Sequence, residues 1–189
     1  MKLDDFHPYV IPHVPNLPLP TVEHHLRMAA EEFFRKTHAW QQALDAQLTL
    51  ADQLVYELDI PAGSQVCKLL EVNVGERDYS KACVLEEPKL MEFQCDAPQA
   101  GMSLEVRVAL TPTVGTVTAT WSLPDSLAQY AKDIAHGALA TLYPMVDGKE
   151  GMAPISQAKF NARISTVGFN VSRGHGRKRL TRAAAANFF

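Results

Sequence analysis

The sequence predicts an α+β fold: a small bundle of three main helices with an inserted antiparallel β region and extended N- and C-terminal arms. Apolar residues recur every three or four positions near both ends of the chain, whereas they alternate with polar residues through its middle. The 189 residues are 47% hydrophobic and 21% charged, which is enough to bury one sizeable core. We expect the α+β domain at residues 21–169, with arms at 1–20 and 170–189.

The first segment is rich in proline, with five prolines between residues 8 and 20. Proline fixes φ and removes a backbone donor, so this segment is predicted to be stiff and extended. Apolar side chains lie between the prolines, and Phe6, Tyr9 and Ile11 are candidate contacts with another polypeptide. The alternative interpretation is a proline-rich ligand, because residues 12–18 contain two overlapping P-x-x-P sequences.

A helix is predicted next, with Thr21 as its capping residue. Its apolar positions are spaced by three and four, as one buried face requires. They are Val22, Leu26, Ala29, Ala30, Phe33 and Phe34. The acidic residues come early in this segment and the basic ones late, which complements the helix dipole. The helix is expected to end near Thr37.

The β region is predicted at about 41–121, where the period changes to two. The stretch 44–50 alternates like a half-buried strand, although its Ala, Gln and Leu also suit a helix. Further strands are expected at 54–60, 66–74, around 84, and at 90–95, 104–111 and 116–121. Turn-forming residues separate them. This pattern is typical of an antiparallel sheet or a small sandwich.

Two further helices are predicted after the β region. Asp125 or Ser126 can cap the first, which stops before Pro144 and contains small residues that let a neighbouring helix approach closely. The last helix is expected from about Ile155 to Phe169. Its inward positions are expected to be Ile155, Ala158, Ala162, Val167 and Phe169.

Charge is distributed unevenly along the chain. Residues 1–150 carry a net charge of −10, whereas residues 151–189 contain seven basic residues and no acidic one. Such a tail meets a polyanion or an acidic protein surface, or is simply solvated. We favour a protein partner, because no aromatic residue lies among the clustered bases and a terminal Phe pair is costly to expose. The candidate contacts are Arg173, Arg177, Lys178, Arg179, Arg182, Phe188 and Phe189.

Motifs for catalysis or cofactor binding are missing from the sequence. It has three cysteines without a C-x-x-C pair, seven histidines without H-E-x-x-H, and no G-x-S-x-G. No apolar run approaches the roughly 18 residues of a membrane span, and the first residues lack the apolar core of a signal peptide. We therefore predict a non-enzymatic protein of a reducing compartment, with no metal, no cofactor and no membrane partner.

The order of these parts resembles the head-to-tail adaptor (connector) proteins of tailed bacteriophages, the tail tubular protein A-like group. The resemblance lies in an N-terminal helix that ends in an aromatic segment (residues 33–40), a β region, a Leu-Pro-x-x-Leu helix start (residues 123–127), a long helix (130–143) and a final helix with an extended C-terminal arm. It covers nearly the whole chain, but its motifs are short and degenerate.

The resemblance implies a structural virion protein of the neck, assembled in the host cytoplasm. Copies would form a homo-oligomeric ring, commonly of twelve, between the portal protein and a downstream tail or neck protein. The C-terminal arm would dock on the portal, and double-stranded DNA would pass through the lumen without sequence-specific binding. An acidic body suits a lumen along which DNA slides.

Two other functions stay open: another tail or baseplate subunit, or a nucleic-acid-binding module that uses the basic tail. The resemblance does not account for the proline-rich N-terminal segment. The adaptor hypothesis also depends on both chain ends contacting other polypeptides, so an end packed on its own domain would contradict it.

Overall fold

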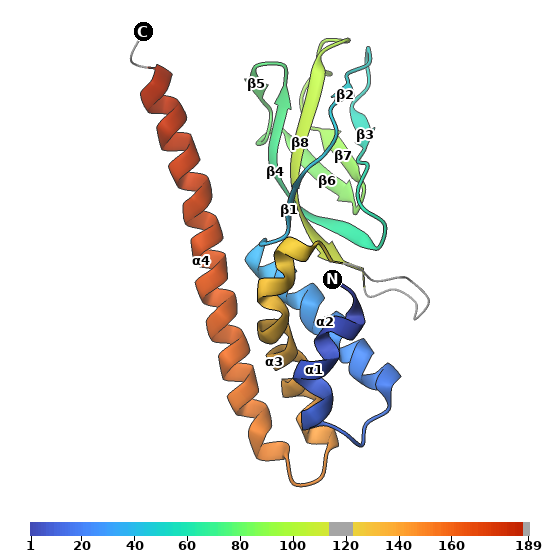
Figure 1. Ribbon diagram of the computed structural model, residues 1–189. Coiled ribbons are helices and arrows are strands. Elements are labelled where there is room, and N and C mark those ends of the chain that lie inside the picture. Colours follow the sequence, from blue (N-terminus) through green and yellow to red (C-terminus); the bar gives the residue numbers. More distant parts are fainter. Residues whose placement is uncertain (114–122, 187–189) are drawn as a thin grey trace. The chain divides into compact units, whose positions relative to one another are not determined.

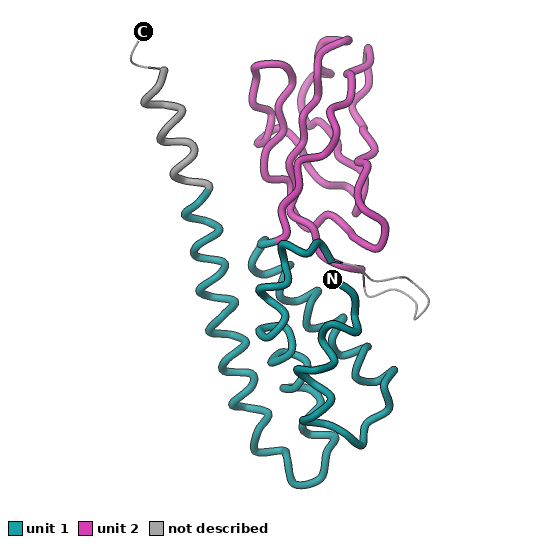
Figure 2. Tube along the Cα trace, viewed as in Figure 1, with its two compact units in different colours: residues 1–39, 123–189 teal, residues 40–122 magenta. Residues whose placement is uncertain are grey.

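The computed structural model describes residues 1–113 and 123–186, with the side chains of the last helix described as far as Gly174. The chain divides into two compact units (Figure 2). The helical unit comprises Met1–Ala39 and Leu123–Phe189, and the β unit comprises Trp40–Ser122. The predicted α+β class is confirmed. The β region was expected at about 41–121, close to the bounds of the β unit.

Three long helices dominate the helical unit: α2 (Leu19–Thr37), α3 (Ala131–Leu142) and α4 (Ala153–Ala186). A 3-10 turn at Asp125–Tyr130 leads into α3, and two more, at Tyr143–Met145 and Glu150–Met152, lie between α3 and α4. Helix α3 packs against both α2 and α4 (Figure 1). The close approach depends on Gly137, where a Cβ would lie 2.8 Å from the Phe160 ring and 3.0 Å from Ala29.

An aromatic cluster fills the centre of this unit. Phe33 and Phe34 from α2 and Phe160 from α4 are all buried, and the Phe33 and Phe160 ring centroids lie 6.1 Å apart. Tyr130 adds a fourth ring, 5.2 Å from Phe33. Large buried rings contribute most of the apolar area of a small core, so these residues hold α2 and α4 together.

The N-terminal segment is not extended, and this prediction is wrong. Residues 1–14 form helical turns at Leu3–Phe6, His7–Val10 (α1) and Ile11–His13. Their apolar residues recur at helical spacing (Leu3, Phe6, Val10 and Val14) and all are buried. Proline is compatible with the first turn of a helix, because the N–H that it lacks has no partner there. The N-terminal end therefore packs on its own unit, which contradicts the hypothesis in its two-armed form.

The C-terminal arm expected at 170–189 is not extended either, because α4 runs from Ala153 through to Ala186. The glycines at 174 and 176 each cost a helix about 1 kcal/mol relative to alanine. The Arg, Lys, Leu and Ala residues around them are good helix formers, and they extend the helix well past the expected end at Phe169.

The predicted helix caps also differ from those observed. Helix α2 begins at Leu19 after Pro18, so Thr21 lies inside its first turn. The next helical segment begins after Pro124, and neither Asp125 nor Ser126 caps it with a side-chain hydrogen bond. In both cases a proline with an extended ψ, 136° at Pro18 and 142° at Pro124, occupies the N-cap position, and the helix starts at the next residue.

The β unit contains two antiparallel sheets. The larger has the strand order β1-β8-β4-β5, and β2 also pairs with β8; the smaller has the order β3-β7-β6 (Figure 1). The strands are β1 (Gln41–Ala43), β2 (Gln47–Leu48), β3 (Val55–Glu57), β4 (Ser64–Val74), β5 (Arg77–Asp78), β6 (Cys83–Glu87), β7 (Leu90–Phe93) and β8 (Ser103–Pro112). The strand predicted at 116–121 lies outside the described residues.

The core of the β unit comes from alternating positions of its strands. Val72, Val106 and Leu110 are buried on the large sheet, and Met91 and Phe93 on the small one. The Phe93 ring meets Tyr56 and Tyr79 edge-on, at centroid distances of 5.7 and 5.6 Å. Side chains that alternate across a pleated strand reach opposite faces, so each sheet keeps a second face for solvent or a partner.

The cysteines of the β unit differ in reactivity. Burial, with a further contribution from Cys95, raises the pKa of the Cys83 thiol to about 12. Because the thiolate is the nucleophile, Cys83 should resist alkylation near neutral pH, whereas the exposed Cys95 should react readily. Mass spectrometry after brief iodoacetamide treatment tests this order. Equal labelling of Cys83 and Cys95 in the folded protein would contradict the packing described for β6.

Within the described ranges, none of the helices combines the length and apolar character that crossing a bilayer requires.

Candidate interaction surface

Helix α4 has an inner face that packs on the helical unit. Ser156, Phe160 and Val167 are buried along it, with Ile164 and Val171 half-buried. Of the inward positions expected from the sequence, Val167 is correct, but Ile155, Ala158, Ala162 and Phe169 are exposed. The two sets lie on roughly opposite sides of the helix, since each residue turns it by 100°. The sequence pattern therefore identified an apolar face of α4, but the opposite face is the one that is buried.

The exposed set forms a continuous stripe on the outer face of α4, which we call the outer stripe. It consists of Ile155, Ala158, Ala162, Ser165 and Phe169, at alternating spacings of three and four residues. Ile155 is 50% exposed and Phe169 57% exposed. This spacing is that of the contact positions of packed helices, so the stripe has the pattern of an interface, and it is left exposed by the described part of the chain.

The charges around the outer stripe are all basic. Lys159, Arg163 and Arg173 lie on the exposed part of α4, and the helix sequence contains no acidic residue. The Arg163 Nε donates to both carboxylate oxygens of Asp133 at 3.0 Å, which fastens α4 to α3. The guanidinium carbon of Arg173 lies 4.6 Å from the centroid of the Phe169 ring, a cation–π distance.

The other residues predicted to contact partners have different surroundings. Arg177, Lys178, Arg179 and Arg182 belong to α4, but their side chains lie outside the described part of the chain, as do Phe188 and Phe189. Phe6 is fully buried in the helical unit and cannot reach a partner, so its prediction as a contact is wrong. Tyr9 and Ile11 are exposed.

A second exposed apolar face lies on the small sheet, and sequence reasoning did not single it out. The strand register places Val55, Glu92 and Val84 in one row, and Glu57, Leu90 and Glu87 in the next. Val55 is 42% exposed and Val84 37% exposed, whereas Tyr56 and Met91 between the rows face the core. We call these six residues the outer sheet face. Simple alternation does not mark it, since Val84-Leu85 and Leu90-Met91 are adjacent apolar pairs, so the face becomes readable only once the strand pairing is known.

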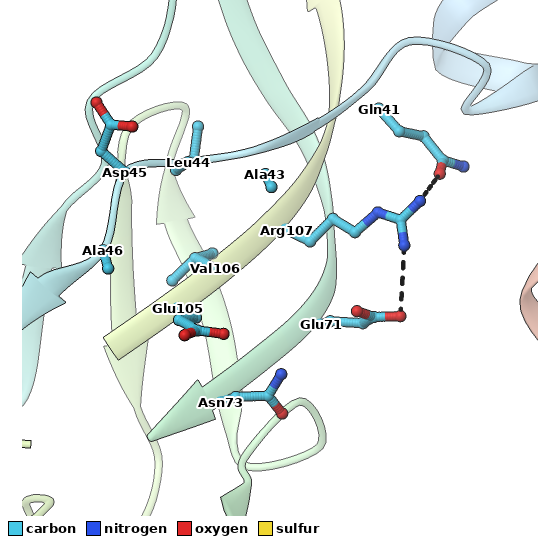
Figure 3. Close-up of a pocket in the computed structure, with 10 residues that line it drawn as sticks. All are labelled: Gln41, Ala43, Leu44, Asp45, Ala46, Glu71, Asn73, Glu105, Val106 and Arg107. Carbon is cyan, nitrogen blue, oxygen red and sulfur yellow. Dashed lines mark hydrogen bonds and ion pairs between the residues drawn. The ribbon is translucent and has the colours of Figure 1, made fainter. Parts of the chain in front are cut away.

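A pocket of about 570 Å³ opens on the large sheet. Its charged side chains come from Asp45, Glu71, Glu105 and Arg107 (Figure 3). One Arg107 nitrogen donates to the Gln41 side-chain oxygen at 2.9 Å, and the other lies 3.6 Å from Glu71 (Figure 3). The guanidinium therefore joins β1, β4 and β8. The role that these contacts support is to fix three strands together.

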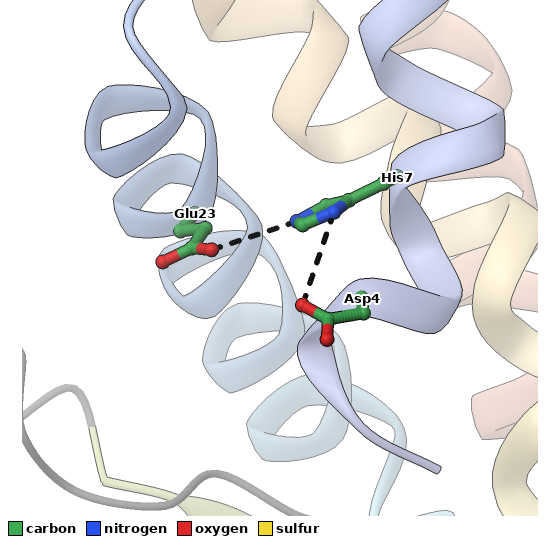
Figure 4. Close-up of side chains that lie close together, drawn as sticks. All are labelled: Asp4, His7 and Glu23. Atoms are coloured by element: carbon green, nitrogen blue, oxygen red, sulfur yellow. Dashed lines mark ion pairs between the residues drawn. The ribbon is translucent and has the colours of Figure 1, made fainter.

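A histidine and two carboxylates meet where the N-terminal segment packs on α2. The His7 ring lies between Asp4, with Nδ1 3.9 Å from its carboxylate, and Glu23, with Nε2 3.6 Å away (Figure 4). One ligand atom from each residue lies within 4.8 Å of the others, a donor set that Zn²⁺ accepts. Asp4 is largely exposed, so the cluster is explained equally well by ion pairs that hold the N-terminal segment on α2. Sequence analysis missed it, because Glu23 reaches the other two only through folding.

Two histidines of the helical unit give it a pH dependence. Burial, then His24, lowers the pKa of His25; burial, then Lys159 and Lys132, lowers that of His136. Both therefore resist protonation when folded but take up protons when unfolded, near their ordinary pKa of 6.5. Stability should fall as the pH drops below about 6.5.

Thermal unfolding at about pH 7.5 and about pH 5.5 measures this effect, in a range above most carboxyl titrations. His136→Gln should show a smaller loss on acidification than the wild type. His24→Gln is the control, because it removes only the smaller contribution to the lowered pKa of His25 and none of those that act on His136, so its loss should stay close to that of the wild type. An equal loss in all three proteins would contradict the assignment to His136.

No protein-family model matches this sequence, and a search of curated proteins returns no match.

Proposed function

We propose that this protein is a structural subunit of a tailed-bacteriophage neck, forming a homo-oligomeric ring between the capsid portal and the tail. In this proposal the C-terminal part of α4 docks on the portal protein, the opposite side of the ring receives a tail or neck protein, and DNA passes through the lumen. The protein acts by binding, in the virion, with no catalytic step.

The observation that carries the proposal is the outer face of α4. It combines exposed Ile155 and Phe169 with basic residues only, on a helix whose other face is already packed. A long helix with an unpartnered apolar and basic face suits assembly into a larger particle. The observed order, a β unit inserted between helices, agrees with the order of parts on which the resemblance to the adaptor proteins rests, except that α4 takes the place of the extended C-terminal arm.

The N-terminal end has no part in this proposal, because Phe6, Val10 and Val14 pack within the helical unit. The proposal thus rests on one end of the chain, residues 170–189, instead of two. Only residues 170–189 have to contact the portal protein. Tyr9 and Ile11 are exposed, but the proposal assigns them no contact.

Deletion of residues 170–189 tests the proposed role in the parent phage. The truncated chain keeps Ser156, Phe160 and Val167, so it should fold, as circular dichroism and thermal unfolding would show. Capsids should nevertheless fail to join tails. Normal joining by a folded truncated protein would contradict the proposal.

The alternative function with an observation in its favour is nucleic-acid binding, because α4 carries seven basic residues and no acidic one. Duplex DNA binding measured over a range of salt concentrations separates the two. A steep salt slope that is lost in Arg177→Ala/Lys178→Ala/Arg179→Ala would favour the nucleic-acid module. Weak binding unaffected by this triple change is expected of a ring subunit.

A further inference from the structure

We propose that the outer stripe of α4 in one copy docks on the outer sheet face of a neighbouring copy. This inference rests on the proposed ring and names the surfaces that join its subunits. The outer stripe is exposed and has basic side chains beside it, and the outer sheet face combines exposed Val55, Val84, Glu57 and Glu87 with half-buried Leu90 and Glu92. In this inference, the partner that covers each surface is a second copy of the same chain.

The apolar parts of the two surfaces match in kind and size. Ile155, Ala162 and Phe169 form a ridge along α4, and Val55, Val84 and Leu90 form apolar patches across three strands. Three strands span about 10 Å across the sheet, comparable to the diameter of one helix. The small side chains of Ala158 and Ala162 let a sheet approach the helix backbone closely.

The charges of the two surfaces are opposite. Glu57, Glu87 and Glu92 lie among the apolar residues of the outer sheet face, whereas Lys159 and Arg173 lie beside the outer stripe. The imbalance extends beyond them, since residues 40–122 contain twelve acidic and five basic residues and α4 contains only basic ones. Charge complementarity of this kind favours pairing of unlike surfaces and disfavours helix-to-helix contact between copies.

A contact between unlike surfaces has a consequence for assembly. Each copy would offer one helix face and one sheet face, so each can bind two neighbours in a head-to-tail manner. Such a heterologous contact generates a closed ring when the rotation closes, or an open filament when it does not. The ring required by the proposed function is therefore one of the two assemblies that these surfaces allow.

Cross-linking between two single-cysteine variants tests the contact directly. In a cysteine-free background (Cys67→Ser, Cys83→Ala and Cys95→Ser), one variant carries Ala162→Cys and a second, of different mass through a tag, carries Val84→Cys. A short bifunctional maleimide should link the two variants to each other when they are mixed. Neither variant alone should form dimers. The same pair with Asn161→Cys in place of Ala162→Cys serves as the control, and it should link less.

Charge exchange gives a second, independent measurement. Glu57→Lys/Glu87→Lys and Lys159→Glu/Arg173→Glu should each weaken self-association at least tenfold, and a mixture of the two variants should recover it. Glu76→Lys/Asp96→Lys makes the same charge change at exposed positions of the β unit off this face and should leave association unchanged. Circular dichroism checks that every variant folds.

The outcomes separate this inference from the proposed function. Rings on the portal without cross-links between positions 84 and 162 would overturn the inference and leave the ring intact. Specific cross-links in filaments, with no ring, would support the contact and contradict the neck role. Dimers of the Ala162→Cys variant alone, or of the Val84→Cys variant alone, would overturn the inference.

Discussion

Replacing Phe160 with alanine should lower the free energy of unfolding by about 3–5 kcal/mol, as the loss of a fully buried aromatic ring does. The ring lies against Phe33 and over Gly137, and it is the largest buried side chain of α4 among the described residues. Its removal leaves a cavity between three helices. We expect α4 to be the element most weakened, because Phe160 is the largest side chain that it buries against α2 and α3.

Denaturant unfolding followed by circular dichroism measures this change, with Phe169→Ala as the matched control. Phe169 is on the same helix and has the same side chain, but it is 57% exposed, so its loss should alter stability by about 0.5 kcal/mol or less. Similar destabilisation by the two substitutions would contradict the assignment of inner and outer faces.

Replacing Phe169 with aspartate should weaken self-association at least tenfold while leaving the monomer folded. The substitution removes the largest exposed apolar side chain of the outer stripe and puts a negative charge where acidic side chains of the neighbouring copy are proposed to lie. Burial of a Phe side chain is worth about 1.5–3 kcal/mol, and each 1.4 kcal/mol is a factor of about ten in affinity.

Sedimentation at increasing protein concentration measures this affinity. Asn170→Asp is the control, because it adds the same negative charge one residue further on, about 100° round the helix and off the stripe. Association that is unchanged by Phe169→Asp, or weakened equally by both substitutions, would contradict the role of the outer stripe.

Local sequence signals predicted much of the fold. The three- and four-residue spacing of Leu26, Ala30 and Phe33 gave α2 its buried face, and the alternation in 66–74 and 104–111 marked the two longest strands. The small residues of 135–140 predicted a close contact between helices, and Gly137 makes this contact with Phe160. In these segments local pattern and tertiary packing agree, so periodicity alone is sufficient.

The wrong predictions concern segments in which two sequence patterns favour different structures. In residues 1–14 the prolines suggested an extended arm, but Phe6 and Val10 repeat at helical spacing, and their burial decides the conformation. In α4 both faces carry apolar residues, and only the partners in space decide which one is buried. Phe160 is buried because Gly137 leaves room for its ring against α3, and no periodicity within α4 records that space.

The candidate surfaces were predictable only in part. Charge bias pointed to the end of the chain, and Arg173 indeed lies exposed on α4 beside the outer stripe. The outer sheet face depends on the pairing of β3 with the β6-β7 hairpin, which brings Val55 beside Val84 and Leu90 from a distant part of the sequence. Such long-range register is set by the packing of the whole unit.

Electron microscopy of the purified protein mixed with portal rings tests the central proposal most directly. It should show a second ring of this protein, coaxial with the portal and with α4 reaching the portal surface. Portal rings that stay bare at saturating protein concentration would contradict the account.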